Sequence, residues 1–177
     1  MERGFRAAVN VVLSLLQLRP YLNSGRGPRE IEELNALEFL RSIHRNLSRL
    51  FEAVEKSISF DEKKQVFREI KRELAAHARI EEGIFFPAIE DYPDLAQQVR
   101  ESFKRHTHVR VLLRGIDDLL SEDKPCDHAL GILKDTVCSA NEQEEAEIFP
   151  QAERLLDRET LDRLARQFHV ATAEPID

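Results

Sequence analysis

Apolar residues recur at spacings of three and four along most of the chain, which is the periodicity of amphipathic helices. After a linker at residues 23–28, four such segments cover residues 30–59, 62–90, 93–121 and 126–149, and the short joints SFDE, DYPD and SEDKP separate them. Short joints make successive helices antiparallel neighbours. The pattern therefore predicts an all-α, up-down-up-down antiparallel four-helix bundle, followed by a further helix at residues 151–168.

The ends of the chain add one helix on each side of this bundle. Residues 1–17 alternate between an apolar and a polar face, lack a small-x-small cleavage site, and are followed by no run of 18 apolar residues, so we expect neither a signal peptide nor a membrane span. The predicted organisation is an N-terminal amphipathic helix and linker at 1–28, the bundle at 29–155, and a C-terminal helix and tail at 156–177. The first helix is expected to pack on the bundle or on a second copy of the chain, which would give a homodimer.

Polar residues interrupt the apolar seams of the four helices. In the first bundle helix, at residues 30–59, the predicted core positions are Leu37, Leu40, His44, Leu47, Phe51, Val54 and Ile58. Across all four helices, the polar residues at core positions are His44, His77, Glu81, His106 and Glu144. They lie at similar distances from the joints, so antiparallel packing should bring them into one layer. His108 falls off the seam.

This layer favours a metal site over a metal-free polar core. Burying two carboxylates is costly, and a cation held between them and neutral imidazoles removes that cost. Carboxylate and imidazole ligands from facing helices are typical of di-iron bundles. No cysteine joins the layer, which argues against a thiolate zinc site, and calcium or magnesium would not use three histidines. Iron fits best, and manganese or zinc follow.

The segment ANEQEEAEIFP at residues 140–150 of the fourth bundle helix can be aligned in two ways with HARIEEGIFFP at residues 77–87. Pairing Ala140 with Glu144 repeats the spacing of His77 and Glu81 before a Phe-Pro pair and lies on the seam, whereas pairing Asn141 with Glu145 does not. We prefer the first alignment, in which alanine replaces a fourth histidine. This leaves a di-iron centre with open positions, a single-metal site, or a bundle that has lost its metal.

The phrase HARIEEGIFFPAIE at residues 77–90 resembles the HxxxEE and Phe-Pro motif of the hemerythrin-like, or HHE cation-binding, family. SIHRNL and KRHTHV resemble the single-histidine helices of that family, and the resemblance covers about residues 37–155. It implies a four-helix bundle with non-haem iron, usually two irons, in which His44, His77 and His106 are terminal ligands and Glu81 and Glu144 are bridges. It also implies binding or sensing of O2 or NO, or peroxide handling. Glu82 could support this shell from outside, although α-helical geometry faces it away.

The remaining features limit partners and location. The net charge of −7 is spread over interleaved acidic and basic residues, so the sequence offers no basic face for nucleic acid or anionic membrane. Cys126 and Cys138, if on one helix, would lie about 18 Å apart, beyond disulfide reach, which favours reduced thiols and a cytoplasmic location.

The sequence leaves two functions open. The first is an iron protein that binds a diatomic gas or handles peroxide, in which apolar layers containing Leu47, Phe51, Leu74, Val109, Leu113 and Val137 would form a gas-accessible pocket. Binding without turnover is favoured over an enzyme. The second is a metal-free or single-metal helical bundle that serves as a regulatory or protein-interaction domain.

Overall fold

The computed structural model describes residues 34–173, and helices make up almost all of this range. Four long helices form the body: α4 (Ala36–Lys56), α5 (Phe60–Ile80), α7 (Ala96–Ser121) and α8 (Asp127–Gln143). α5 continues through the π-helical turn η1 (Glu81–Phe85) into α6 (Phe86–Ile89), and α8 continues through the π-helical turn η2 (Glu144–Ile148) into α9 (Phe149–Leu155). The last helix is α10 (Arg158–Ala173).

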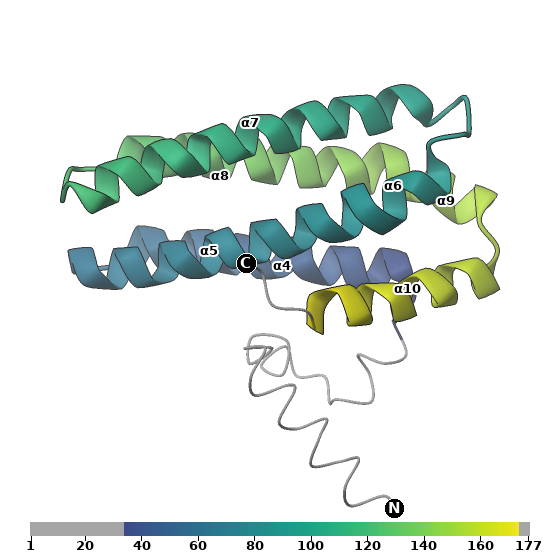
Figure 1. Cartoon of the computed structure of the whole chain (residues 1–177), viewed down its shortest axis with the longest axis horizontal. Helices are drawn as coiled ribbons and strands as arrows, with labels where there is room; N and C mark the ends of the chain where they lie inside the picture. Colours follow the sequence, from purple (N-terminus) through teal and green to yellow (C-terminus); the bar gives the residue numbers. More distant parts are fainter. Residues whose placement is uncertain (1–33, 174–177) are drawn as a thin grey trace, which may run out of the picture.

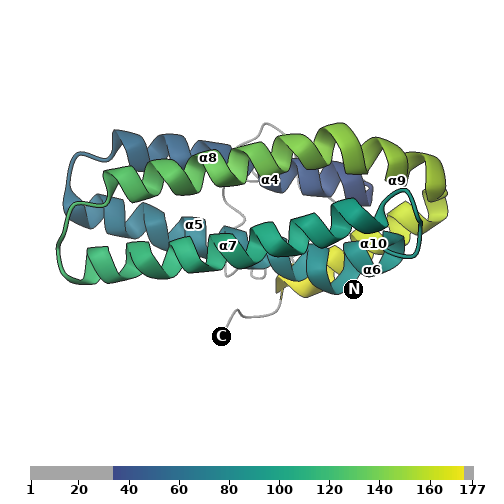
Figure 2. The ribbon, with the colours of Figure 1, turned by 90° about the horizontal axis from the view of Figure 1, so that it is seen from above.

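The four long helices form the predicted antiparallel bundle (Figures 1 and 2). α4 packs on α5 and α8, and α7 packs on α8 and α5, so each helix has two neighbours around a shared core. Large aromatic side chains fill much of that core, and the fully buried ones are Phe51, Phe67, Phe85, Phe86, Phe149 and Phe168. The all-α bundle predicted from the periodicity is confirmed.

Polar caps define where the first two bundle helices begin. The Asn35 side chain accepts a hydrogen bond from the Glu38 backbone N–H at 3.0 Å, and the Glu38 carboxylate accepts one from the Asn35 N–H at 3.2 Å. Such reciprocal capping satisfies backbone donors that a helix start would otherwise leave free. At the start of α5 the Ser59 hydroxyl accepts from the Glu62 N–H at 3.1 Å, and the Glu62 carboxylate accepts from the Ile58 N–H at 2.9 Å. Between these helices, α4 ends at Lys56, and Ile58, predicted in the core, is 98 % exposed in the joint.

Each π-helical turn ends two residues before a proline. The Phe86 N–H donates to the Glu81 carbonyl, five residues back, and the Phe149 N–H donates likewise to the Glu144 carbonyl. Pro87 and Pro150 follow, and a proline has no N–H and crowds the carbonyl four residues before it. A wider turn relieves this conflict without ending the helix.

α10 adds a fifth layer against the bundle. It packs on α4, α5 and η1 and lies beneath them in Figure 1, with the Phe168 ring 5.7 Å from the Phe39 ring. The predicted start at residue 151 was wrong, because residues up to Leu155 continue α9 and the break falls at Leu156, which has an extended backbone. The N-terminal helix expected within residues 1–28, and any dimer that it forms, lie outside the described residues.

Candidate metal centre

The structure brings the five polar core residues predicted from the sequence together in the middle of the bundle. Each bundle helix or its π turn contributes at least one of them, and exposed fractions range from 0 to 8 %: His44, His77, Glu81, His106 and Glu144. Ligand-type atoms of four of them, His44, His77, Glu81 and Glu144, lie within 4.8 Å of one another. The layer expected from the joint distances is therefore present, whereas His108 is exposed as predicted.

Glu81 lies between two of the histidines. Its Oε2 is 3.3 Å from Nε2 of His77, one helical turn before it, and 3.2 Å from Nε2 of His106 on α7. Neither Glu81 oxygen has a hydrogen-bond partner within the described part of the chain. The fully buried Glu81 carboxylate is thus surrounded by imidazoles and receives no hydrogen bond from the described residues.

Glu144 occupies the matching position at η2. Its Oε2 is 3.7 Å from Nε2 of His44, and its Oε1 accepts a hydrogen bond of 3.0 Å from the Ser102 hydroxyl. Arg105 extends this chain by donating from Nη2 to the Ser102 oxygen at 2.9 Å. The residue one turn before Glu144 is Ala140, so the counterpart of His77 is missing here.

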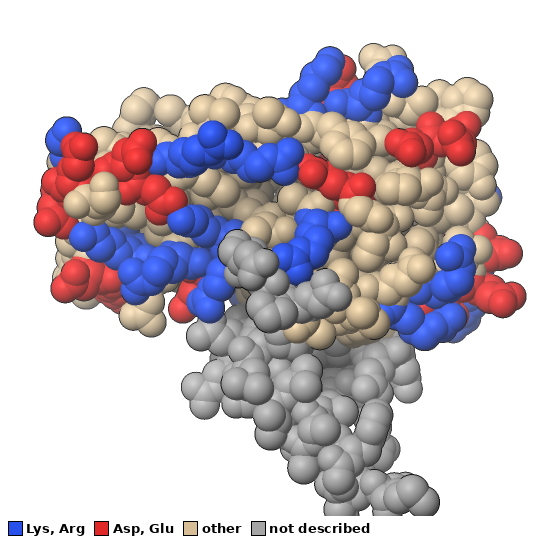
Figure 3. Space-filling model, in the orientation of Figure 1, with Lys and Arg blue, Asp and Glu red and all other residues tan. Residues whose placement is uncertain are grey.

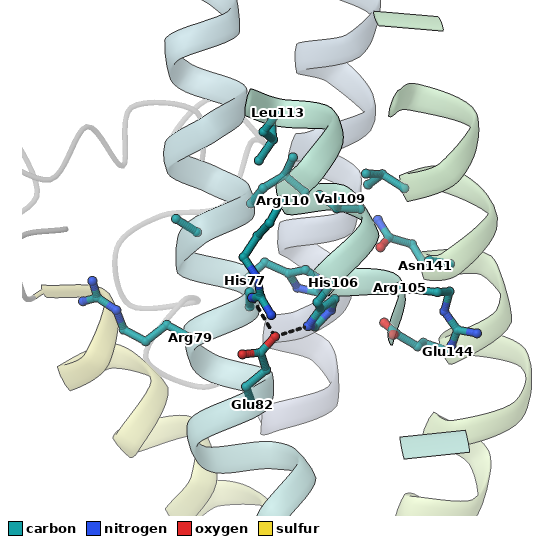
Figure 4. Close-up of a pocket in the computed structure, with 15 residues that line it drawn as sticks. His77, Arg79, Glu82, Arg105, His106, Val109, Arg110, Leu113, Asn141 and Glu144 are labelled. Carbon is teal, nitrogen blue, oxygen red and sulfur yellow. Dashed lines mark hydrogen bonds and ion pairs between the residues drawn. The ribbon is translucent and has the colours of Figure 1, made fainter. Parts of the chain in front are cut away.

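Two further carboxylates hold the outer nitrogens of the histidines. His106 Nδ1 lies 2.9 Å from Glu82 Oε1, and His44 Nδ1 lies 2.7 Å from Glu145 Oε1. An Nδ1–H donated outward leaves Nε2 with its lone pair directed inward, which is the tautomer that ligates a metal. Figure 4 shows Glu82 reaching His106 and also Arg110, whose Nη1 donates to the same oxygen at 2.9 Å.

Burial shifts the pKa values of Glu81, Glu144 and His77 in the directions that favour the uncharged form of each side chain. It raises the pKa of Glu81 to about 8, and burial together with the charge of Glu81 raises the pKa of Glu144 to about 8. Burial lowers the pKa of His77 well below its usual value, and the neighbouring His44 and His106 lower it further. By contrast, the hydrogen bond to His44 holds the pKa of Glu145 below its usual value. Neutral imidazoles are ready ligands, and a cation would draw the inner carboxyls into their charged form.

The unsatisfied atoms of the layer fit a cation. Within the described residues, the buried atoms without a hydrogen-bond partner include His44 Nε2, His77 Nδ1, both Glu81 oxygens and Glu144 Oε2. Buried polar atoms are normally paired, and a cluster of orphaned oxygen and nitrogen atoms points to a missing ligand. Three imidazoles and two carboxylates offer the donors that transition metals prefer.

Comparison with known families agrees with this geometry. The model of the hemerythrin HHE cation-binding domain matches residues 35–152, which include all four bundle helices and the whole polar layer. The chain belongs to the hemerythrin HHE family. No curated protein and no solved structure gives a significant match.

Two features of this hemerythrin HHE domain were not predicted from its sequence. Glu82 was considered as an outer support of the shell, although α-helical geometry was expected to face it away, and its carboxylate lies 2.9 Å from Nδ1 of His106. The π-helical turn η1 rotates less per residue than an α-helix and so keeps Glu82 nearer to the side on which Glu81 lies. Glu145 was considered only as an alternative to Glu144, whereas both face His44. The Glu-Glu doublet that recurs in HARIEE and ANEQEE was the available signal.

Ala140 lines a cavity beside the polar layer of the hemerythrin HHE domain. The cavity has a volume of about 280 Å³ and lies between α5, α7 and α8, with His77, His106 and Glu144 at one side. Asn141, expected to flank the seam, is 6 % exposed and also lines this cavity (Figure 4). Of the predicted apolar pocket, Leu74, Val109, Leu113 and Val137 line it, whereas Leu47 and Phe51 are buried elsewhere in the core.

Proposed function

We propose that this hemerythrin HHE domain binds iron in the buried layer and uses it to bind or sense O2 or NO, or to handle peroxide. One observation carries the proposal: five buried titratable side chains converge, namely His44, His77, Glu81, His106 and Glu144. All of them except His106 leave buried atoms without a hydrogen-bond partner among the described residues. A stable bundle would not retain such a cluster without a cation to offset its burial.

The donor set favours iron over other metals. Imidazole and carboxylate ligands without thiolate suit iron, and manganese or zinc come next. Two irons are proposed, with Glu81 and Glu144 between them, and a single ion is the alternative that Ala140 leaves. On this reading the three histidines are terminal ligands, as the family resemblance implies.

A gas or peroxide ligand suits the surroundings of the layer. Iron supplies the exchange of electrons with a small bound ligand, and the protein supplies a protected site. The aliphatic side chains of Leu74, Val109 and Val137 border the cavity next to the histidines, where they would admit a small uncharged molecule and slow the entry of water. Binding or sensing is proposed ahead of catalytic turnover.

A cytoplasmic location is proposed from the two thiols. Cys126 and Cys138 are both free, and burial raises the pKa of each, so neither is poised for thiolate chemistry. No helix in the described range is long and apolar enough to cross a bilayer. Acidic and basic side chains are both present on the face in Figure 3. Ion pairs such as Lys64–Asp123 and Lys71–Asp117 join residues of opposite charge, which supports a domain without a nucleic-acid or membrane partner.

Metal content in matched histidine variants tests the proposal. Wild-type protein and the His77→Ala and His108→Ala variants would be expressed with added iron, purified without chelator, and measured for iron per chain, with circular dichroism as a check of the fold. We expect His77→Ala to lose iron and the exposed control His108→Ala to keep the wild-type content. Equal iron in all three, or no iron in wild-type protein after anaerobic reconstitution, would overturn the proposal, and the second result would favour a metal-free interaction domain.

A further inference from the structure

The cavity beside Ala140 is too large for a diatomic ligand. A water molecule takes up about 30 Å³ of liquid, and a dry cavity of about 150 Å³ holds benzene. The volume of about 280 Å³ therefore suits a molecule of about ten non-hydrogen atoms. This space lies where a histidine at position 140 would project.

The walls of the cavity divide into an apolar part and a polar part. Aliphatic side chains form most of the apolar lining, namely Leu74, Ala75, Ala78, Val109, Leu113, Val137 and Ala140. The polar lining residues are His77, Arg79, Glu82, Arg105, His106, Arg110, Asn141 and Glu144. The Arg79 guanidinium is directed away from the cavity and donates to the Ala171 carbonyl at 3.3 Å. Figure 4 shows Arg105, Asn141 and Glu144 together on the α8 side of the cavity.

Charge at this end of the cavity favours an anion. Arg110 is paired with Glu82. Arg105 donates hydrogen bonds to the Ser102 hydroxyl and the Gln143 side chain, and its charge also acts on the Glu101 carboxylate, but its buried Nε has no hydrogen-bond partner within the described residues. Two divalent ions would also carry four positive charges against the two negative charges of Glu81 and Glu144. An anion beside them would be stabilised by both sources of positive charge.

We propose that this cavity binds a small organic monocarboxylate with an apolar body, in the place that the absent histidine leaves. The carboxylate lies at the end formed by Arg105 and Asn141, next to the metal layer, and the apolar body lies among Val109, Leu113 and Val137. This inference rests on the iron-binding function proposed above, because the ligand is placed against the open side of that centre. It makes the domain responsive to a metabolite as well as to a gas.

Calorimetric titration with benzoate tests this proposal. Iron-loaded protein of measured metal content would be titrated with benzoate and with its neutral counterpart benzamide. We expect one benzoate per chain with a Kd below about 1 mM, and binding of benzamide about tenfold weaker or more. Benzoate should also change the visible spectrum of the iron-loaded protein.

Three variants locate the site. Ala140→Leu places a larger side chain in the part of the cavity next to the polar layer, where the carboxylate is proposed to lie, and should weaken benzoate binding at least about tenfold while iron is retained. Ala146→Leu makes the same substitution at an exposed position of η2 and should bind benzoate as wild type does. Arg105→Gln should weaken benzoate about tenfold and leave benzamide unchanged.

The outcomes separate this inference from the function on which it rests. Full iron content without benzoate binding, equal affinity for benzoate and benzamide, or a benzoate affinity unchanged by Ala140→Leu would overturn the carboxylate site and leave the iron site intact. Absence of iron in the reconstituted protein would overturn both.

Discussion

Glu82 and Glu145 are the residues through which the histidines of the layer are oriented. Each accepts from the Nδ1 of a histidine on a different helix, and each follows directly after one of the inner glutamates. The repetition makes the site nearly symmetric: Glu81 and Glu82 face His106, and Glu144 and Glu145 face His44. Ala140 breaks this symmetry, because it stands four residues before Glu144 as His77 stands four residues before Glu81.

Removing either outer carboxylate should weaken metal binding without removing a ligand. Glu82→Ala and Glu145→Ala should each lower iron affinity by about 10-fold to 100-fold, because the histidine loses the partner that fixes its tautomer and orientation. Competition with a chromogenic chelator measures this loss. Glu142→Ala, at an exposed position of α8, is the matched control, and an equal effect in the control would contradict the orienting role.

At the scale of elements, periodicity was sufficient to predict the bundle but not its irregular turns. Apolar spacing located four helices and the five inner side chains because burial repeats every three to four residues in an α-helix. The same reasoning assumes an α-helical rotation throughout, so it predicted that Glu82 faces away from the layer. It also predicted that the first bundle helix extends to Ile58, whereas α4 ends at Lys56. The predicted apolar pocket was correct for Leu74, Val109, Leu113 and Val137 and wrong for Leu47 and Phe51. The volume of the cavity could not be predicted, since it depends on how side chains from three helices leave the space beside Ala140 unfilled.

The π-helical turn η1 can be tested by shortening it. Gly83 is an exposed residue of η1, and its deletion combined with Pro87→Ala, which removes the proline that the wider turn accommodates, should let the helix return to α-helical geometry. Glu82 would then rotate away from His106, and we expect iron affinity to fall about as far as in Glu82→Ala, by about 10-fold to 100-fold. Gly83→Ala, which meets no atom within 4 Å, is the control that keeps the chain length. Undiminished affinity after the deletion would show that the π turn does not position Glu82.

At the scale of the whole molecule, the buried residues proposed to bind metal lower the stability of the metal-free bundle. The aromatic core and the packing of α10 stabilise the bundle. At its centre, burial raises the pKa values of the Glu81 and Glu144 carboxyls. α10 lies beyond the residues that match the family, yet Phe168 is fully buried against the bundle. The domain therefore consists of a family bundle with an additional helix packed on its α4 and α5 face.

Metal-free protein should lose stability as pH rises from about 6.5 to about 8. The pKa of Glu81 and of Glu144 is raised to about 8 in the folded protein, so the folded state holds protons that the unfolded state releases at lower pH. Each proton contributes at most about 1.4 kcal/mol per pH unit to the decline. The lowered pKa of His77 acts in the opposite direction, but only below the ordinary histidine value, so it does not offset the decline in this window.

Thermal denaturation of metal-free and iron-loaded protein across this pH range measures the effect. Iron-loaded protein should show no such decline, since its carboxylates are already charged, and the difference in Tm between the two forms should widen with pH. The Glu81→Gln/Glu144→Gln double variant, measured without metal, should lack the slope. A metal-free wild-type protein with equal stability at both ends of the range would contradict the assignment of raised pKa values to these carboxyls.

Anomalous X-ray scattering at the iron absorption edge, from crystals of iron-loaded protein, tests the central claim most directly. We expect strong anomalous density within the layer, in contact with His44, His77, His106, Glu81 and Glu144. Two peaks would establish a di-iron centre that tolerates Ala140, and one peak would establish a mononuclear site on the same residues. Iron bound only at surface carboxylates, or no anomalous density in the layer of a fully iron-loaded crystal, would contradict the account.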